Sequence, residues 1–254
     1  HWYKPSSLLS HLNKRVSRVS CVSNAVRNQV RKQLWRNKQK AVTIYKGHNM
    51  DWYNGIEPTS RLELGIPESA FLVGIVANLR TMKGVKYFIK AANYLAGNHD
   101  IHFMMIGRGM DSPEVNSLID KTPLKENFHT WGYRNDVLNA VAACDVAVNS
   151  SIKGEGLSKT TIEAMCLRIP VIATSIGGNP ELVVNMQTGL LIPPKSPKAI
   201  ANAILQYKTD KTLMTKMAEN GRDFIQKNIT VEKTASETLK VYKELMKEAG
   251  KLNI

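Results

Sequence analysis

Two glutamates, Glu155 and Glu163, stand eight residues apart around a glycine-rich turn that leads into a predicted helix. The turn, residues 150–158, follows a strand-like apolar run, and its glycines allow the backbone to bend tightly and approach a ligand closely. Ser158 is suited to cap the helix that follows, where unpaired N–H groups favour an anion. This stretch predicts an anion site that suits a diphosphate.

Carboxylates beside such a site accept hydrogen bonds from vicinal hydroxyl groups, as acidic residues do when they hold a ribose. If residues 155–163 were helical throughout, Glu155 and Glu163 would lie about 12 Å apart, comparable with the reach of a nucleotide diphosphate-sugar. The pattern indicates a nucleotide-sugar site, with the sugar at one end and the ribose at the other. Exposed glutamates in surface ion pairs are the alternative.

Two basic residues, Arg80 and Lys83, follow another strand-like run. Loops after parallel strands meet at one edge of the sheet, so these side chains would lie beside residues 150–158. There they would neutralise a diphosphate and stabilise it as a leaving group. Solvation of two surface cations is the alternative.

Two further loops follow predicted strands at this edge. The first contains Gly109 in a Gly-Arg-Gly run, which lacks the third glycine of the dinucleotide fingerprint. In the second, Tyr133 and Arg134 are suited to hold a nucleotide base by stacking or hydrogen bonding, or to pack against the sheet.

Short apolar runs alternate with amphipathic stretches, which is typical of a parallel sheet covered by helices. We predict an α/β fold: a doubly wound, Rossmann-like parallel sheet with a helical C-terminus, plus a β-α-β remnant of a second Rossmann-like domain. The predicted strands are near 16–22, 41–45, 71–77, 101–106, 128–131, 145–149, 170–174 and 189–192. The predicted helices are near 24–37, 83–96, 114–121, 135–143, 158–168, 179–185, 197–207, 210–227 and 231–249.

Composition along the chain predicts four segments. Residues 1–46 are the end of one domain, and residues 47–69, with their Gly and Pro interruptions, are a connector. Residues 70–230 form a complete second domain, and residues 231–254 form a C-terminal helix that packs back on the first. Because the chain starts with histidine and its first segment is too small to bury a core, we expect a piece of a longer protein.

The charge of the chain is concentrated at one end. The net charge is +14, and residues 1–46 contain eleven Lys and Arg with no Asp or Glu. A predicted helix lies within the basic stretch 14–40, which favours an anionic partner: lipid headgroups, a phosphorylated substrate or nucleic acid. A solvated surface is the alternative. Because the stretch carries no RNA-binding aromatic platform, we expect no nucleic acid partner.

The composition, 43% hydrophobic and 22% charged, is that of a globular protein and excludes collagen-like and low-complexity chains. No apolar run approaches the ~18 residues of a membrane span, and the basic N-terminal stretch lacks the apolar core of a signal peptide. Three widely spaced cysteines favour reduced structural thiols in a cytoplasmic protein over a disulfide framework or a metal site.

Several runs, taken in order, resemble the motifs of one enzyme family. Residues 155–165 look like the E-x7-E motif of retaining glycosyltransferases of the GT-B fold, family 4, also called group 1. The resemblance covers essentially the whole chain. Further similar runs are 21–24, 42–47, 82–84, 105–109, 169–174, 177–182 and 188–194.

The resemblance implies specific roles, with no metal and no other cofactor. By motif position, Glu163 would hold the ribose hydroxyls, and Glu155 would contact the donor sugar near the reacting carbon. Lys83, with Arg80 as the nearest arginine, would clamp the diphosphate. The other donor-binding residues would be Gly109, Tyr133, Arg134, Gly156, Leu157 and Ser158.

The resemblance also implies the reaction. A sugar would pass from a nucleotide diphosphate-sugar to a saccharide or lipid-linked acceptor with retention of configuration, in the synthesis of cell-surface polysaccharide or lipopolysaccharide. The enzyme would be cytoplasmic and peripheral on the inner face of the plasma membrane, with residues 14–40 against anionic lipid. Two departures stand out. Asn78 replaces an arginine that many members have, and most of the acceptor-binding domain is absent, so we expect donor binding with weak activity.

Two other functions stay open at this point. A nucleotide-sugar epimerase could use a similar fold, although no His/Glu pair is placed for proton abstraction. A non-enzymatic basic module would bind membrane or nucleic acid with strong salt dependence and without nucleotide preference.

Overall fold

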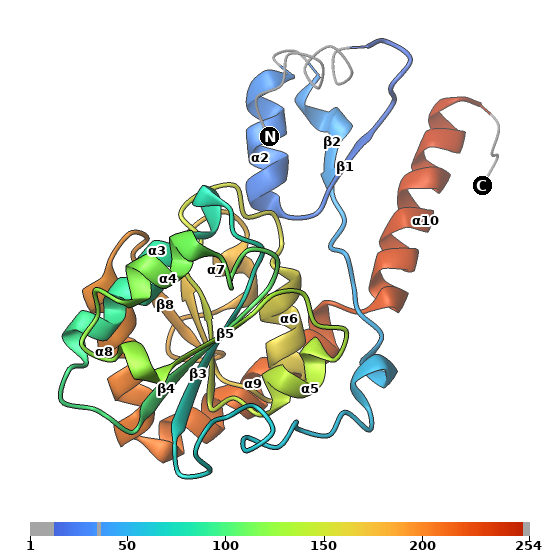
Figure 1. The fold of residues 1–254 in the computed structure, drawn as a ribbon. Coiled ribbons are helices and arrows are strands. Elements are labelled where there is room, and N and C mark those ends of the chain that lie inside the picture. The colour runs from blue at the N-terminus through green and yellow to red at the C-terminus, as the bar shows by residue number, and fades with distance from the viewer. Residues whose placement is uncertain (1–12, 35–36, 251–254) are drawn as a thin grey trace. The chain divides into compact units, whose positions relative to one another are not determined.

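The computed structural model describes residues 13–34 and 37–250 (Figure 1). The chain divides into two compact units, a larger one formed by Tyr53–Ile225 and a smaller one formed by His1–Trp52 with Gln226–Ile254. In the described ranges, no helix has both the length and the apolar character needed to cross a membrane.

The larger unit is built on a six-stranded sheet in which all neighbouring strands are parallel. Its order, β5-β4-β3-β6-β7-β8, is that of a doubly wound Rossmann-like sheet. The predicted fold class is therefore confirmed. The strands are β3 (Phe71–Val76), β4 (Ile101–Ile106), β5 (Phe128–Trp131), β6 (Val146–Asn149), β7 (Val171–Thr174) and β8 (Leu190–Ile192).

Helices cover both faces of this sheet because its central strands are apolar on both sides. On one face, Phe88, Phe103 and Tyr207 belong to a core that the sheet shares with α3, α4 and α8. Helices α5 and α6 lie on the other face (Figure 1). The helices of this unit are α3 (Val85–Ala91), α4 (Pro113–Ile119), α5 (Val137–Ala142), α6 (Lys159–Cys166), α7 (Asn179–Leu182), α8 (Pro197–Thr209) and α9 (Lys211–Asn228), the last of which ends in the smaller unit.

The helix predicted over 83–96 is broken in the structure. A 3₁₀ turn ends at Lys83, α3 starts only at Val85, and a second 3₁₀ turn follows it. Between the first turn and α3, Gly84 has a φ of +66°, and a Cβ there would lie 2.1 Å from the carbonyl oxygen of Ser150. A close contact between two loops therefore sets the start of the helix, and helical periodicity cannot reveal it.

Residues 53–69, predicted as part of a connector, pack into the larger unit. Leu64 and Ile66 are buried, with 4% and 1% of their surfaces exposed. The guanidinium group of Arg61 donates to the Asp145 carboxylate at 3.0 Å. The Gly and Pro interruptions predict irregular backbone here, but they do not determine whether it packs. The four predicted domain segments remain a prediction.

The smaller unit contains the predicted strand–helix–strand. Strands β1 (Val19–Cys21) and β2 (Ala41–Thr43) pair in parallel, and α2 (Asn24–Gln33) packs on them through Val30 and Leu34. Residues 35–36 of the predicted helix lie outside the described part of the chain. Helix α10 (Val231–Glu248) joins this unit through Thr234, whose hydroxyl donates to the Tyr45 carbonyl oxygen at 2.7 Å and accepts from the Gly47 amide at 2.8 Å.

Candidate nucleotide-sugar site

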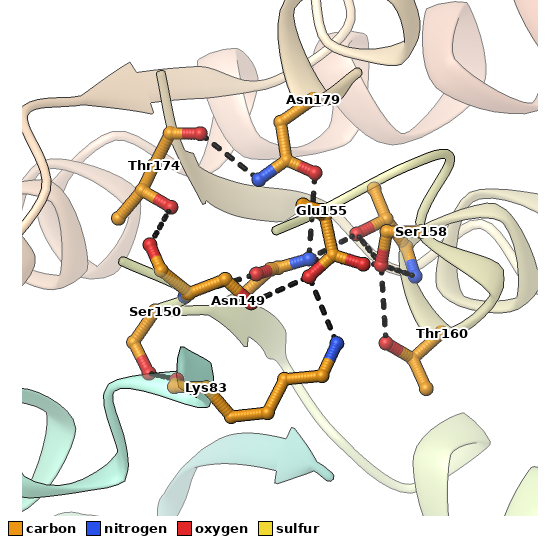
Figure 2. Close-up of polar contacts among 10 residues, drawn as sticks. Lys83, Asn149, Ser150, Glu155, Ser158, Thr160, Thr174 and Asn179 are labelled. Carbon is orange, nitrogen blue, oxygen red and sulfur yellow. Dashed lines mark hydrogen bonds and ion pairs between the residues drawn. The ribbon is translucent and has the colours of Figure 1, made fainter. Parts of the chain in front are cut away.

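The loops after β3 and β6 meet where the strand order of the sheet reverses. β3 and β6 are neighbours, and the later strands follow outward from them on opposite sides. In open α/β sheets, ligands bind beyond the carboxyl ends of the strands at this switch point. Residues 77–84 and 150–158 therefore frame the candidate site, which Figure 2 shows in close-up.

Hydrogen bonds hold these two loops together. The hydroxyl group of Ser150 donates to the carbonyl oxygen of Lys83 at 2.9 Å. The amide of Ile152 donates to the carbonyl oxygen of Met82 at 2.8 Å. Because both bonds involve the backbone of residues 82–83, the base of the Lys83 side chain is fixed relative to the second loop.

Glu155 lies between these loops with only 7% of its surface exposed. Its Oε2 accepts hydrogen bonds from Lys83 Nζ at 2.8 Å and from Ser151 Oγ at 2.6 Å. Its carbonyl oxygen accepts from the amide of Gly178 at 3.2 Å, and a Cβ at Gly177 would lie 1.9 Å from that oxygen. Main chain and side chain of Glu155 are thus both held, and the Lys83 ammonium compensates the buried charge.

The start of α6 offers free amide groups beside Glu155. Ser158 is the N-cap, as predicted, and its Oγ accepts from the Thr161 amide at 3.3 Å and from Asn149 Nδ2 at 2.8 Å. The amides of Gly156 and Leu157 donate to no group within the described residues. The Ser158 hydroxyl is therefore committed to the helix start, whereas the two amides are available to an anion.

Glu163 lies in the second turn of α6 and is 8% exposed. Its Oε1 pairs with Nζ of Lys159 at 2.9 Å, one helical turn earlier. The estimate of about 12 Å between the two glutamates assumed a continuous helix. That assumption is wrong, because α6 begins at Lys159 and Glu155 lies in a loop.

Two buried groups near Glu163, the Cys166 thiol and the Tyr53 hydroxyl, have raised pKa values. Burial, and to a lesser extent the nearby Glu163 carboxylate, raises the pKa of the Cys166 thiol to about 12, against an opposing effect of Arg222. Burial, with smaller contributions from Cys166 and Glu163, raises the pKa of the Tyr53 hydroxyl. Cys21, Cys144 and Cys166 are all buried thiols in the structure.

Arg80 does not join the hydrogen-bonded residues around Glu155. It precedes the 3₁₀ turn with extended backbone and an exposed side chain, which makes no hydrogen bond or ion pair with another described residue. Asn78, two residues earlier, accepts a hydrogen bond from the Arg108 amide at 3.2 Å and so joins the loops after β3 and β4. Asn78 thus occupies a structural position, and the Arg80 side chain remains open to a ligand.

The residues predicted to hold a base lie beyond β4 and β5. Gly109 has a φ of +83°, and a Cβ there would lie 3.0 Å from the Cβ of Leu79, so its loop lies against the loop after β3. The Tyr133 ring is 69% exposed, with the Arg108 guanidinium 5.9 Å from its centroid. Arg134 is already paired with Asp136, and their hydrogen bond is the main reason why the pKa of that carboxyl group is lowered. Tyr133 is therefore the more accessible of the two for stacking.

Sequence reasoning missed the polar residues that support Glu155. Asn149 and Ser151 follow one another closely at the end of β6, and Asn179 starts α7. Asn179 Nδ2 donates to the Thr174 carbonyl oxygen at 2.9 Å, and its Oδ1 lies 3.5 Å from Asn149 Nδ2 (Figure 2). Loop polar residues are ordinarily exposed, so only their burial, complete for Ser151 and Asn179 and partial for Asn149, distinguishes these.

Comparison with known proteins identifies the family. Residues 57–224 match the family described as glycosyl transferases group 1. The chain belongs to this family.

Relatives of this chain carry specific activities in their names. It is 28% identical over 241 residues to an Escherichia coli UDP-Gal:alpha-D-GlcNAc-diphosphoundecaprenol alpha-1,3-galactosyltransferase, covering 92% of this chain and 62% of that one. It is 24% identical over 231 residues to the N-acetyl-alpha-D-glucosaminyl L-malate synthase of Bacillus anthracis, covering 91% and 60%. The chain thus spans about 60% of the length of these curated relatives.

Solved structures share the fold of this chain. The Anabaena protein Alr3699/HepE in complex with UDP-glucose superposes with a TM-score of 0.83 at 23% identity, over 95% of this chain and 68% of that one. A glycosyltransferase from Rickettsia africae gives 0.84 at 23% identity, over 96% and 68%. Both comparisons agree with the Rossmann-like architecture.

Proposed function

We propose that this glycosyltransferase transfers a sugar from a nucleotide diphosphate-sugar to a saccharide or lipid-linked acceptor with retention of configuration, as a family 4 member. One observation carries the proposal: the buried Glu155 is paired with Lys83 at the switch point, beside the open amides of Gly156 and Leu157. A carboxylate that suits hydroxyl groups and cationic or N–H groups that suit phosphates therefore lie side by side.

The proposed donor lies along the start of α6. Glu163 holds the ribose hydroxyls, and Glu155 holds the sugar near its reacting carbon. The diphosphate lies between them, contacted by Lys83, by Arg80 and by the amides of the helix start. The exposed side chain of Arg80 and the open amides support this arrangement. Gly109, Tyr133 and Arg134 border the nucleotide base.

In the proposed reaction, the bond between the anomeric carbon and the diphosphate breaks through an oxocarbenium-like transition state, and the acceptor oxygen bonds on the same face. Negative charge develops on the departing diphosphate, and preorganised cations and N–H groups stabilise it. The Glu155 carboxylate lies near the developing positive charge of the sugar. The proposal uses no metal and no other cofactor.

We propose a uridine nucleotide as the first donor to test. The E. coli relative is named for UDP-Gal, and the Anabaena structure holds UDP-glucose. A role in cell-surface polysaccharide or lipopolysaccharide synthesis is supported by the E. coli relative and by a lipopolysaccharide core mannosyltransferase of Rhizobium meliloti, 27% identical over 192 residues.

We also propose a cytoplasmic enzyme whose basic segment, residues 14–40, contacts the anionic inner face of the plasma membrane. Its support is charge alone: described residues of the segment carry lysine and arginine without Asp or Glu. Sedimentation with vesicles that contain or lack anionic lipid, at low and high salt, tests this proposal. Equal sedimentation with both kinds of vesicle would contradict it.

Calorimetry of the chain against UDP-, GDP-, ADP- and dTDP-sugars tests donor binding. We expect one nucleotide class to bind, and heats that are the same for all four or absent for all four would refute the proposal. We expect slow transfer by these 254 residues, because the chain spans only about 60% of the length of its relatives. Product analysis with donor and acceptor, with the anomeric configuration assigned by NMR, tests retention.

A further inference from the structure

The Glu155 carboxylate receives both of its side-chain hydrogen bonds on one oxygen. Lys83 and Ser151 donate to Oε2 at 2.8 and 2.6 Å. Oε1 accepts no hydrogen bond from the described residues. The carboxylate is therefore held through Oε2, and its Oε1 is available to a ligand in the site.

The two donors differ in how firmly they are held. The Lys83 side chain is 29% exposed and reaches Glu155 through four flexible bonds. Ser151 is 1% exposed, its amide donates to Asn149 Oδ1 at 3.1 Å, and its carbonyl oxygen accepts from the Thr174 hydroxyl at 2.6 Å. Ser151 is thus held by the last residues of β6 and β7, whereas the long side chain of Lys83 can redirect.

A diphosphate at the start of α6 would compete with Glu155 for the Lys83 ammonium. Phosphate oxygens are strong acceptors for a charged donor. When two anions lie beside one cation, each of them interacts with that cation more weakly. Once Lys83 turns toward the diphosphate, the remaining hydrogen bond to Oε2 comes from Ser151. That bond stays in place because it does not depend on a mobile side chain.

We infer that Ser151 is a positioning residue, which holds Glu155 with Oε1 toward the donor sugar when Lys83 engages the diphosphate. The inference rests on the proposed function. In this inference, the Ser151–Glu155 pair binds the sugar of the donor and Lys83 binds its diphosphate. Loss of the Ser151 hydroxyl should therefore affect a nucleotide-sugar more than the bare nucleotide.

The test compares Ser151→Ala and the near-isosteric Ser151→Cys with Thr188→Val. Thr188 is the control, since its hydroxyl is likewise buried, with 7% of the residue exposed, and donates to the carbonyl oxygen of Leu182 at 3.3 Å instead of Glu155. Calorimetry with UDP and UDP-glucose gives the ratio of the two affinities for each variant. We expect the ratio to shift against UDP-glucose about tenfold in both Ser151 variants and less than twofold in Thr188→Val.

A second readout needs no ligand. In protein labelled with carbon-13, the carboxyl resonance of Glu155 should move in both Ser151 variants and stay in place in Thr188→Val. An unmoved resonance together with an unchanged affinity ratio would overturn the inference while leaving the proposed function intact. The resonance could move in both Ser151 variants although the wild-type chain binds no nucleotide. That outcome would refute the proposed function but leave Ser151 as the residue that orients Glu155.

Discussion

Lys83 Nζ lies 2.8 Å from Glu155 Oε2, although 72 residues separate them in the chain. The glutamate side chain is 8% exposed and the lysine side chain 29%, so the pair is only partly screened by solvent. Each partner compensates a charge that would otherwise be costly to bury. The same two groups are those that we propose to meet the sugar and the diphosphate.

Replacement of either partner should destabilise the fold. We expect Lys83→Met to lower the free energy of unfolding by about 1–2 kcal/mol, because it leaves the Glu155 charge uncompensated. Lys86→Met, at an exposed lysine close by, should change it by less than about 0.5 kcal/mol. In a urea double-mutant cycle with Glu155→Gln, the two effects should not be additive, and additivity would contradict an energetic pair.

Replacement of Glu163 should weaken nucleotide binding, whereas replacement of its ion-pair partner Lys159 should not. Glu163→Ala removes two hydrogen-bond acceptors from the proposed ribose site, so we expect nucleotide binding to weaken by ~1–3 kcal/mol in calorimetry. Lys159→Ala removes only an ion-pair partner that is 73% exposed, with an expected effect of about 0.5 kcal/mol or less. Unchanged binding in Glu163→Ala would exclude the ribose assignment.

Gly84 should not tolerate a side chain. Its φ of +66° is unfavourable for other residues, and a Cβ would overlap the Ser150 carbonyl oxygen at 2.1 Å. We expect Gly84→Ala to cost about 2–4 kcal/mol of stability by separating the loops of the site. Gly97→Ala is the matched control, because nothing lies within 4 Å of its Cβ position. Equal melting temperatures of the two variants would contradict the close loop contact.

Acid should destabilise the protein through a histidine pair on β4 and β5. His102 Nδ1 lies 2.9 Å from His129 Nε2, and burial, with a smaller effect of His102, lowers the pKa of His129 to about 4. Since the unfolded chain takes up this proton near pH 6.5 and the folded chain near 4, stability is full above pH 6.5 and is lost as the pH falls. We expect His129 to account for at most about 2 kcal/mol between pH 7 and pH 5.

Urea denaturation at the two pH values measures this loss. His129→Gln should flatten the pH dependence, whereas His99→Gln, at an exposed histidine, should leave it as in the wild type. If His129→Gln lost stability between the two pH values as steeply as the wild type, groups other than His129 would be responsible for the pH dependence.

The sequence by itself determined the larger elements and the nature of the site. Apolar runs flanked by polar turns are local signals, so the strands 71–77 and 101–106 appear in the structure within one residue of their predicted ends. The Ser158 cap is also local, since it depends on residues of one turn. The E-x7-E spacing, together with further motifs in order, was sufficient to indicate the family.

Only the tertiary structure decided which polar groups meet. Ser151 supports Glu155, and residues 53–69 pack into the larger unit through Arg61, yet neither fact follows from a local pattern. The broken helix at Gly84 has the same origin, because a loop about 65 residues away approaches its backbone. Periodicity reports the environment of one segment, whereas these contacts depend on how strands distant in sequence are brought side by side.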